Sequence, residues 1–157
     1  MNNKTAIKQR IPTEVRENKF FYKGGILFIK LPSGRLLSYV KPRIEENRFG
    51  GESVTYEGIG STKNWERIES YGPKFVENIL QAVSRDLLCY AMHNLSDQRI
   101  GGHVHDELII ECPENTEVSS ITLIMDKSPN WMLDILIRGD GYETNVYKKD
   151  VTVQNPS

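Results

Sequence analysis

The chain has 157 residues, of which 38% are hydrophobic and 26% are charged, as is typical of a soluble globular domain. A chain of this length can bury a hydrophobic core without disulfides or a structural metal. No stretch approaches the ~20 consecutive apolar residues of a membrane helix, and the polar start lacks the apolar segment of a secretion signal. We therefore expect a single domain, no membrane association and a cytoplasmic location.

Cysteine spacing and charge narrow the function classes further. Cys89 and Cys112 form no CxxC pair, which argues against a disulfide framework and against a thiolate zinc site.

The charge is unevenly distributed along the chain. The net charge of −1 combines +7 over residues 1–50 with −8 over residues 51–157. A basic segment beside an acidic one fits a chain in which one part faces a polyanion. An uneven solvated surface gives the same pattern, so both interpretations stay open.

The first predicted elements are β-strands. Residues 1–24 form a leader that starts polar and without periodicity, and we expect it to be disordered or dependent on a partner. Residues 26–31 and 36–40 are β-branched and aromatic runs separated by a Pro-Ser-Gly turn, which predicts a β-hairpin. Residues 53–58 predict another strand.

The strongest pattern is a long amphipathic helix over residues 73–95. Pro73 suits the first helical turn, and the apolar positions 76, 79, 80, 83, 87, 90, 91 and 95 follow a 3.6-residue period. A second set of long hydrogen-bonding side chains recurs at i, i+4, i+7 and i+11 and shares one helix face: Lys74, Asn78, Gln81 and Arg85. Such a face is typical of solvent exposure, and it also suits contact with a nucleic-acid backbone or minor groove.

The second half of the chain predicts a hairpin, a helix and a strand. Short strands at Val104 and at residues 108–110 would form a tight hairpin with His105, Asp106 and Glu107 at its tip. A helix over residues 117–126 and a strand over residues 134–138 follow. Together these elements predict an α+β domain with a mostly antiparallel sheet and a long amphipathic helix.

The acidic hairpin tip suits a divalent cation. Mg²⁺ prefers oxygen ligands and usually takes one or two protein carboxylates beside substrate phosphates. Asp106 at a turn would reach such an ion directly. Glu107 would act through water, because neighbouring residues of a strand point to opposite faces. Acidic residues are also common at turns, so the pattern alone does not establish a metal site.

A second metal hypothesis uses histidines. His103 and His105 form an HxH pair on one face of a strand and, with His93 or a carboxylate, would hold zinc or iron. No HExxH or HxxEH frame supports this site. Motifs of the types GxxxxGK, GxGxxG and GxSxG are also absent, so a P-loop, a dinucleotide site and a hydrolase elbow are unsupported.

Two segments of the chain form a recognisable pair: YGPKFVENILQAVSRDLL, residues 71–88, and HVHDELIIE, residues 103–111. Together they resemble the C-terminal palm of family A DNA polymerases, the DNA polymerase I class, in its short bacteriophage and prophage forms. The VHDE core resembles motif C of the family, and the helix ending in QAxxRD resembles the palm helix that faces the primer-template duplex. Residues 140–150 resemble the carboxyl end of the phage type. The similarity covers about residues 25–150 and leaves residues 151–157 as a tail.

The resemblance implies a DNA-directed DNA polymerase that acts on primer-template DNA and dNTP in DNA replication. It implies that Asp106 binds a catalytic Mg²⁺ pair, that Glu107 is its acidic neighbour and that His105 contacts the primer terminus. It also implies contacts to the duplex from the polar helix face, first from Gln81 and more weakly from Asn78, Lys74 and Arg85.

Two parts of the family pattern have no counterpart in this sequence. One is motif A, a DxSxxE-type strand with the other metal-binding aspartate. The second is the fingers helix, whose RxxxK and tyrosine elements grip the incoming nucleotide. We therefore expect the isolated chain not to polymerise and a second polypeptide to supply both parts. Two other hypotheses stay open: a DNA-binding or regulatory remnant without catalysis, and an HxH metalloenzyme built on His103 and His105.

Overall fold

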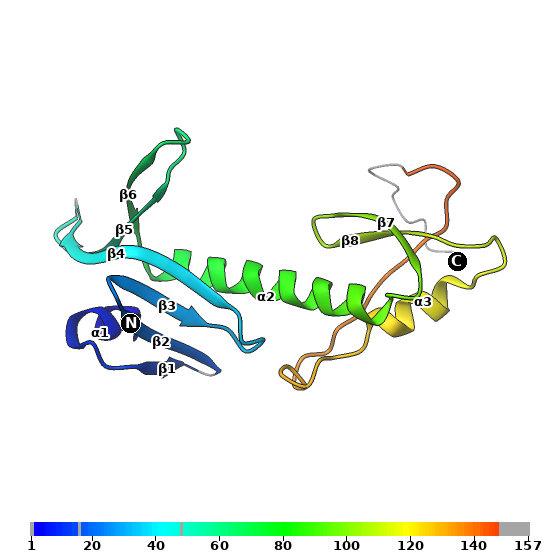
Figure 1. Cartoon of the computed structure of the whole chain (residues 1–157), viewed down its shortest axis with the longest axis horizontal. Helices are drawn as coiled ribbons and strands as arrows, with labels where there is room; N and C mark the ends of the chain where they lie inside the picture. The colour runs from blue at the N-terminus through cyan, green and yellow to red at the C-terminus, as the bar shows by residue number, and fades with distance from the viewer. Residues whose placement is uncertain (1, 16, 48, 148–157) are drawn as a thin grey trace. The chain divides into compact units, whose positions relative to one another are not determined.

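The structure is a computed structural model that describes residues 2–15, 17–47 and 49–147 (Figure 1). It confirms the predicted α+β class with a mostly antiparallel sheet. The chain divides into two compact units, Met1–Val83 and Ser84–Ser157. Within the described residues, no helix is both long enough and apolar enough to span a membrane.

The first unit is built on a six-stranded antiparallel sheet in which each strand pairs with the next along the chain. Its strands are β1 (Thr13–Val15), β2 (Asn18–Lys23), β3 (Ile26–Lys30), β4 (Leu36–Glu46), β5 (Glu52–Ile59) and β6 (Trp65–Ser70). The hairpin predicted over residues 26–40 is confirmed as β3 and β4. Gly24 and Gly25 join β2 to β3 with φ of +59° and +81°, the positive values that a two-residue type I′ turn requires.

The structure differs from expectation over residues 1–24. The described part of this segment forms α1 (Asn2–Gln9), β1 and β2 in place of a leader without regular structure. Ala6 of α1 is fully buried, and Phe20 of β2 is 7% exposed. Because each of these elements offers only one or two buried positions, the sequence window carries too little periodicity to reveal them.

The core of the first unit lies on one face of this sheet. Its buried members come from α1, from the strands, from Leu31 directly after β3 and from the first part of α2 (Gly72–Asn94): Ala6, Phe20, Leu27, Ile29, Leu31, Tyr39, Val54, Phe75 and Ala82. The Tyr39 ring lies 4.9 Å from both Tyr56 and Phe75. Burying each of the larger side chains contributes about 1.5–3 kcal/mol. The opposite face of the sheet is called the outer face below.

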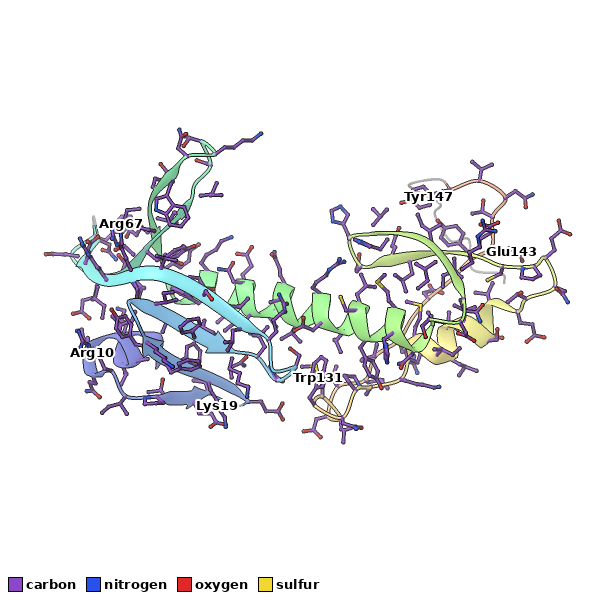
Figure 2. All side chains as sticks on the ribbon, in the orientation of Figure 1. Arg10, Lys19, Arg67, Trp131, Glu143 and Tyr147 are labelled. Atoms are coloured by element: carbon purple, nitrogen blue, oxygen red, sulfur yellow. The ribbon has the colours of Figure 1, made fainter. Side chains whose placement is uncertain are left out.

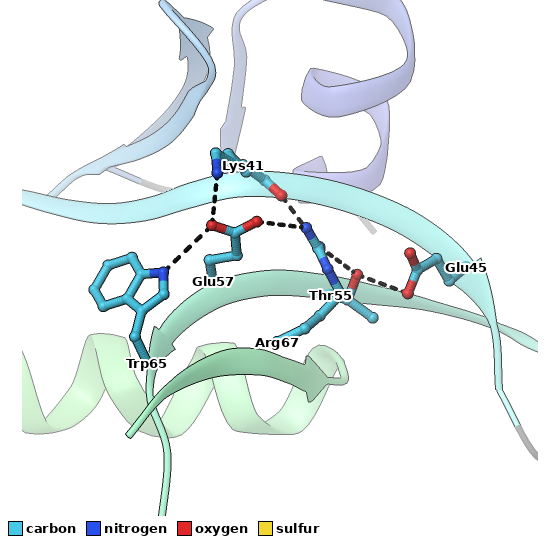
Figure 3. Close-up of polar contacts among 6 residues, drawn as sticks. All are labelled: Lys41, Glu45, Thr55, Glu57, Trp65 and Arg67. Carbon is cyan, nitrogen blue, oxygen red and sulfur yellow. Dashed lines mark hydrogen bonds and ion pairs between the residues drawn. The ribbon is translucent and has the colours of Figure 1, made fainter. Parts of the chain in front are cut away.

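A network of polar side chains covers the outer face across β4, β5 and β6 (Figure 3). Glu57 accepts hydrogen bonds from Lys41 Nζ at 2.9 Å and from Trp65 Nε1 at 3.3 Å. Its other oxygen accepts from Arg67 Nη2 at 3.2 Å, and Arg67 also donates to Thr55 Oγ1 at 3.0 Å. The hydrogen bond from Lys41, followed by that from Trp65, lowers the pKa of the Glu57 carboxyl.

Helix α2 confirms the predicted long helix with a shift of one residue at each end. Phe75 and Ala82 face the core, although neither is among the apolar positions that define the predicted 3.6-residue period. Val76 and Leu80, which the sequence pattern placed on the apolar face, are 55% and 62% exposed. The apolar stripe is therefore wider than the surface that the described residues bury.

The second unit contains the rest of α2, β7 (Arg99–Val104), β8 (Glu107–Glu111) and α3 (Val118–Met125). Its described sheet consists of β7 and β8 alone. The strand predicted over residues 134–138 does not form. The backbone N–H of Gly139 donates to the Asp126 side chain, and Leu136 is 81% exposed. The predicted tail, residues 151–157, lies outside the described residues, as do residues 148–150 of the predicted carboxyl end.

Candidate active site

The β7–β8 hairpin has the tight turn that the sequence predicts. Val104 pairs with Glu107, so His105 and Asp106 are the two residues of the turn. His103 pairs with Leu108, and the register shifts once between Ile100 and Gly102. The ladder thus places an acidic side chain at the tip of a short hairpin.

The backbone at His105 is held in an uncommon conformation. Its φ is +53°, whereas Asp106 is not among the residues with positive φ, and this matches the φ pattern of a type II′ turn. Glycine is the usual residue at the first position of that turn. A left-handed conformation costs other residues about 1–2 kcal/mol. Backbone strain of this kind is frequent at functional sites, so the tip is a candidate for function.

Asp106 presents a carboxylate to solvent. Its side chain is exposed and, within the described part of the chain, makes no hydrogen bond or ion pair. Glu107 differs from its neighbour because it is the first residue of β8 and its Oε2 accepts a hydrogen bond from Tyr147 at 3.5 Å. Figure 2 labels Tyr147 in the segment that follows α3. The two carboxylates are therefore in different environments.

Arg85 of α2 contacts β7 within the second unit. Its two terminal nitrogens, Nη1 and Nη2, each lie 3.3 Å from a ring nitrogen of His103. A guanidinium can only donate hydrogen bonds, so the contact needs at least one unprotonated nitrogen on the ring. The interaction links the predicted DNA-facing helix to the strand that leads into the hairpin tip.

The polar helix face of α2 in the first unit is exposed and is organised around an acidic residue. Lys74 Nζ donates to Glu77 at 2.9 Å, and Gln81 Nε2 donates to the same carboxylate at 3.3 Å. The hydrogen bond to Glu77 raises the pKa of Lys74. Lys74 and Gln81 therefore lie on one exposed helix face as predicted, and both are bonded to Glu77.

Asn78 occupies a different environment from the rest of the polar face. It is half-buried, and its Nδ2 donates to the Tyr39 hydroxyl at 3.2 Å. Burial raises the pKa of Tyr39, and the hydrogen bond from Asn78 acts in the opposite direction. Asn78 therefore supports the core of the first unit, in contrast to the exposed Lys74 and Gln81.

Comparison with known proteins identifies one curated relative. Over 150 residues, covering 92% of the chain, the sequence is 40% identical to the DNA polymerase of Bacillus phage SP02. The chain is similar to a DNA polymerase. It spans 23% of the length of that polymerase. No protein-family model matches the sequence, and no solved structure matches the chain.

The donor set for a metal is incomplete in the described part of this polymerase-like chain. There, no three His, Cys, Asp or Glu side chains gather closely enough to hold an ion. Asp106 and Glu107 supply oxygen donors of the kind that Mg²⁺ prefers. His103, half of the predicted HxH pair, already contacts Arg85. Asp106 and Glu107 therefore match the donor chemistry of a Mg²⁺ site, but the described residues around them do not complete one.

Sequence reasoning did not single out Glu77 and Tyr147, which contact candidate site residues. Glu77 is spaced three and four residues from its partners Lys74 and Gln81, a helical signal that was available. The contact of His103 with Arg85 and that of Tyr147 with Glu107 join residues 18 and 40 positions apart, for which the sequence offers no signal.

Proposed function

We propose that this chain forms the C-terminal palm part of a family A DNA-directed DNA polymerase and contributes Asp106 to template-directed nucleotidyl transfer. One observation carries the proposal. The exposed Asp106 carboxylate, with no partner among the described residues, stands at the tip of a strained two-residue turn. The 40% identity to a phage DNA polymerase supports it.

The hairpin residues have distinct proposed roles. Asp106 and Glu107 would hold Mg²⁺, which when bound favours ionisation of the primer 3′-hydroxyl and neutralises charge on the triphosphate. The Tyr147 hydroxyl donates a hydrogen bond to one oxygen of Glu107 at 3.5 Å and leaves the other oxygen for a metal ion. His105, exposed beside Asp106, would orient the primer terminus through its imidazole.

The exposed face of α2 would contact the duplex. Gln81 suits the hydrogen-bond acceptors of the minor groove, whereas Lys74 and Arg85 suit phosphates. Lys74 and Gln81 must exchange their bonds to Glu77 for bonds to DNA. Asn78 has the smallest proposed role, since its amide already bonds Tyr39.

Polymerisation would require a further segment. The described residues assemble only a partial donor set, and the chain matches 23% of its polymerase relative. We infer that a second aspartate-bearing strand of the motif A type and the nucleotide-binding fingers complete the site. Their source would be a second polypeptide.

The decisive experiment is a chimera in which this chain replaces the matching segment of the phage SP02 polymerase, to which it aligns over 150 residues. Primer extension by the chimera is expected with wild-type chain and Mg²⁺. Asp106→Asn should lower the rate at least about 100-fold, because a ligand contributing several kcal/mol to the transition state is lost. Asp134→Asn, an exposed aspartate of the same unit, is the matched control and should leave the rate unchanged. Absence of extension, or extension indifferent to Asp106→Asn, would overturn the proposal.

A second candidate is a DNA-binding remnant without catalysis, which the exposed Lys74 and Arg85 favour. It predicts duplex binding that weakens with salt and with Lys74→Gln or Arg85→Gln, no effect of Asp106→Asn on binding, and no synthesis.

For the HxH metalloenzyme, the test is bound zinc or iron that is lost in His103→Ala and His105→Ala. No contact in the described structure favours that third function over the other two.

A further inference from the structure

The outer face of β2 and β3 carries a pair of aromatic rings. Phe20, Leu27 and Ile29 point into the core of the first unit. Successive residues of a strand point to opposite faces, so Phe21 and Phe28 lie on the outer face. These two residues are directly paired across the strands.

The two rings form a platform that remains partly open to solvent. Their centroids are 5.2 Å apart, the planes differ by 22°, and both side chains are half-buried. Phe28 pairs on its other side with Ser38 of β4, which is exposed, and the neighbouring Leu36 is 46% exposed. The helices contribute Ala6 and Phe75 to the core on the opposite face of the sheet.

Lysines border this platform. Lys19 and Lys23 lie two residues on either side of Phe21, and Lys30 lies two residues after Phe28, so all three share the outer face. Lys19 and Lys30 are paired directly across the strands, an arrangement of like charges that is unfavourable in the free protein. Lys19 has a counter-ion in Glu14 at 3.7 Å, whereas Lys23 and Lys30 form no ion pair among the described residues.

We propose that the Phe–Lys face, consisting of Lys19, Phe21, Lys23, Phe28 and Lys30, binds single-stranded DNA. Bases would stack on the two rings, and the phosphates would neutralise the lysines. Aromatic side chains on a sheet face with cations at its border are typical of proteins that bind unpaired strands. A duplex keeps its bases stacked inside and cannot use the rings. The excess of basic residues, +7 over residues 1–50, supplies the complementary charge.

The identity of the strand rests on the proposed function. In a polymerase, the unpaired strand is the template ahead of the primer terminus. The platform would hold that overhang through stacking, which tolerates any base because every base has a flat aromatic surface. This role requires no base-specific contact, in agreement with a face that offers rings and ammonium groups and few directional acceptors.

The test measures binding of the full chain to a fluorescent 15-nucleotide oligo(dT) by anisotropy between 50 and 300 mM NaCl. Lys23→Gln combined with Lys30→Gln should weaken binding about 10-fold and reduce the slope of log K against log salt by about 1.4, since each phosphate contact contributes about 0.7. Phe21→Leu combined with Phe28→Leu should weaken binding at least about 5-fold with an unchanged slope. Lys127→Gln, an exposed lysine of the second unit, is the matched control.

The outcomes separate this inference from the proposed function. If the double lysine variant binds the oligonucleotide as tightly as wild type, with an equal salt slope, the inference is overturned whatever Asp106→Asn does to synthesis. If wild type binds as described but the chimera makes no DNA, the face is a single-strand site and the polymerase proposal fails. A chain that dimerises through these phenylalanines, shown by sedimentation of wild type against the double leucine variant, would also overturn the inference.

Discussion

The two units of this chain differ in where their stability and their chemistry reside. The first unit contains the nine-residue hydrophobic core cluster and six paired strands. The buried apolar side chains of the second unit include Leu88, Ala91 and Leu95. The second contains the proposed catalytic hairpin, but its helix α3 has no buried residue. The residues proposed for chemistry thus lie on the less buried scaffold.

This difference has a physical consequence. A two-stranded sheet such as β7–β8 is marginally stable without further packing. The second unit also exposes large apolar side chains after α3, among them Leu133 at 68% and Leu136 at 81%. Exposed apolar residues that cluster along the chain are typical of interaction sites. Under the proposed function, we expect the second unit to gain stability from contacts with the segments that complete the polymerase, and the first unit to need none.

The largest expected effect is a cavity in the first unit. Leu27 is fully buried, so Leu27→Ala should lower the free energy of unfolding of this unit by about 2–5 kcal/mol. Leu123 of α3 is 66% exposed, and Leu123→Ala should change stability by less than about 0.5 kcal/mol. Urea unfolding followed by tryptophan fluorescence reports each unit separately in single-tryptophan proteins, Trp131→Phe for the first unit and Trp65→Phe for the second. Equal effects of the two substitutions would contradict the comparison.

A smaller effect is expected from overpacking in the second unit. A Cβ added at Gly141 would lie 2.8 Å from Val118 Cγ1 and 3.2 Å from Thr122 Cγ2. Gly141→Ala should therefore displace the segment from α3 and cost about 1–3 kcal/mol, seen as earlier unfolding or faster proteolysis after residue 126. Gly72→Ala is the control, since a Cβ there meets nothing within 4 Å. Val118→Ala should relieve the clash in the double variant, and failure to do so would show that another contact is responsible.

Elements were predictable where a pattern was long or a turn was distinctive. Helix α2 spans 23 residues, enough for a 3.6-residue period to emerge, and the hairpin tip followed from two apolar runs around a polar triplet. Strand β1 has three residues and was not predictable. The absence of a strand over residues 134–138 depends on which neighbours are available for pairing, and this is not encoded locally. At the candidate site, the position of Asp106 was predictable, whereas the bond of Tyr147 to Glu107 required the tertiary structure.

Substitutions of His105 at the hairpin tip should separate the stability of the second unit from its proposed activity. His105→Gly removes the strain at φ +53° and should stabilise β7–β8 by about 1 kcal/mol or less, because glycine also loses more backbone freedom on folding. Hydrogen exchange of the β7 and β8 amides should slow accordingly. His105→Ala keeps the strained φ and should give no such slowing. In the chimera, both variants should slow primer extension, because both lack the imidazole.

The smallest expected effect is a pH dependence confined to the first unit. Hydrogen bonds from Lys41, then Trp65, hold the pKa of Glu57 below its ordinary value of 4.5. The unfolded chain therefore binds the proton at a higher pH than the folded chain does. The stabilisation is complete above about pH 4.5 and is lost as pH falls through the lowered value of the folded state. The measurement is the urea midpoint as a function of pH, made in a Trp131→Phe protein in which Trp65 is the remaining tryptophan. In this protein, Glu57→Gln should make the midpoint fall less steeply on the acid side. Lys8 of α1 lowers the pKa of Glu52, so Glu52 should account for a separate part of that curve. If the slope is unchanged in Glu57→Gln but abolished in Glu52→Gln, the pH dependence comes from the contact of Lys8 with Glu52. The polar network of Glu57 then does not contribute to it.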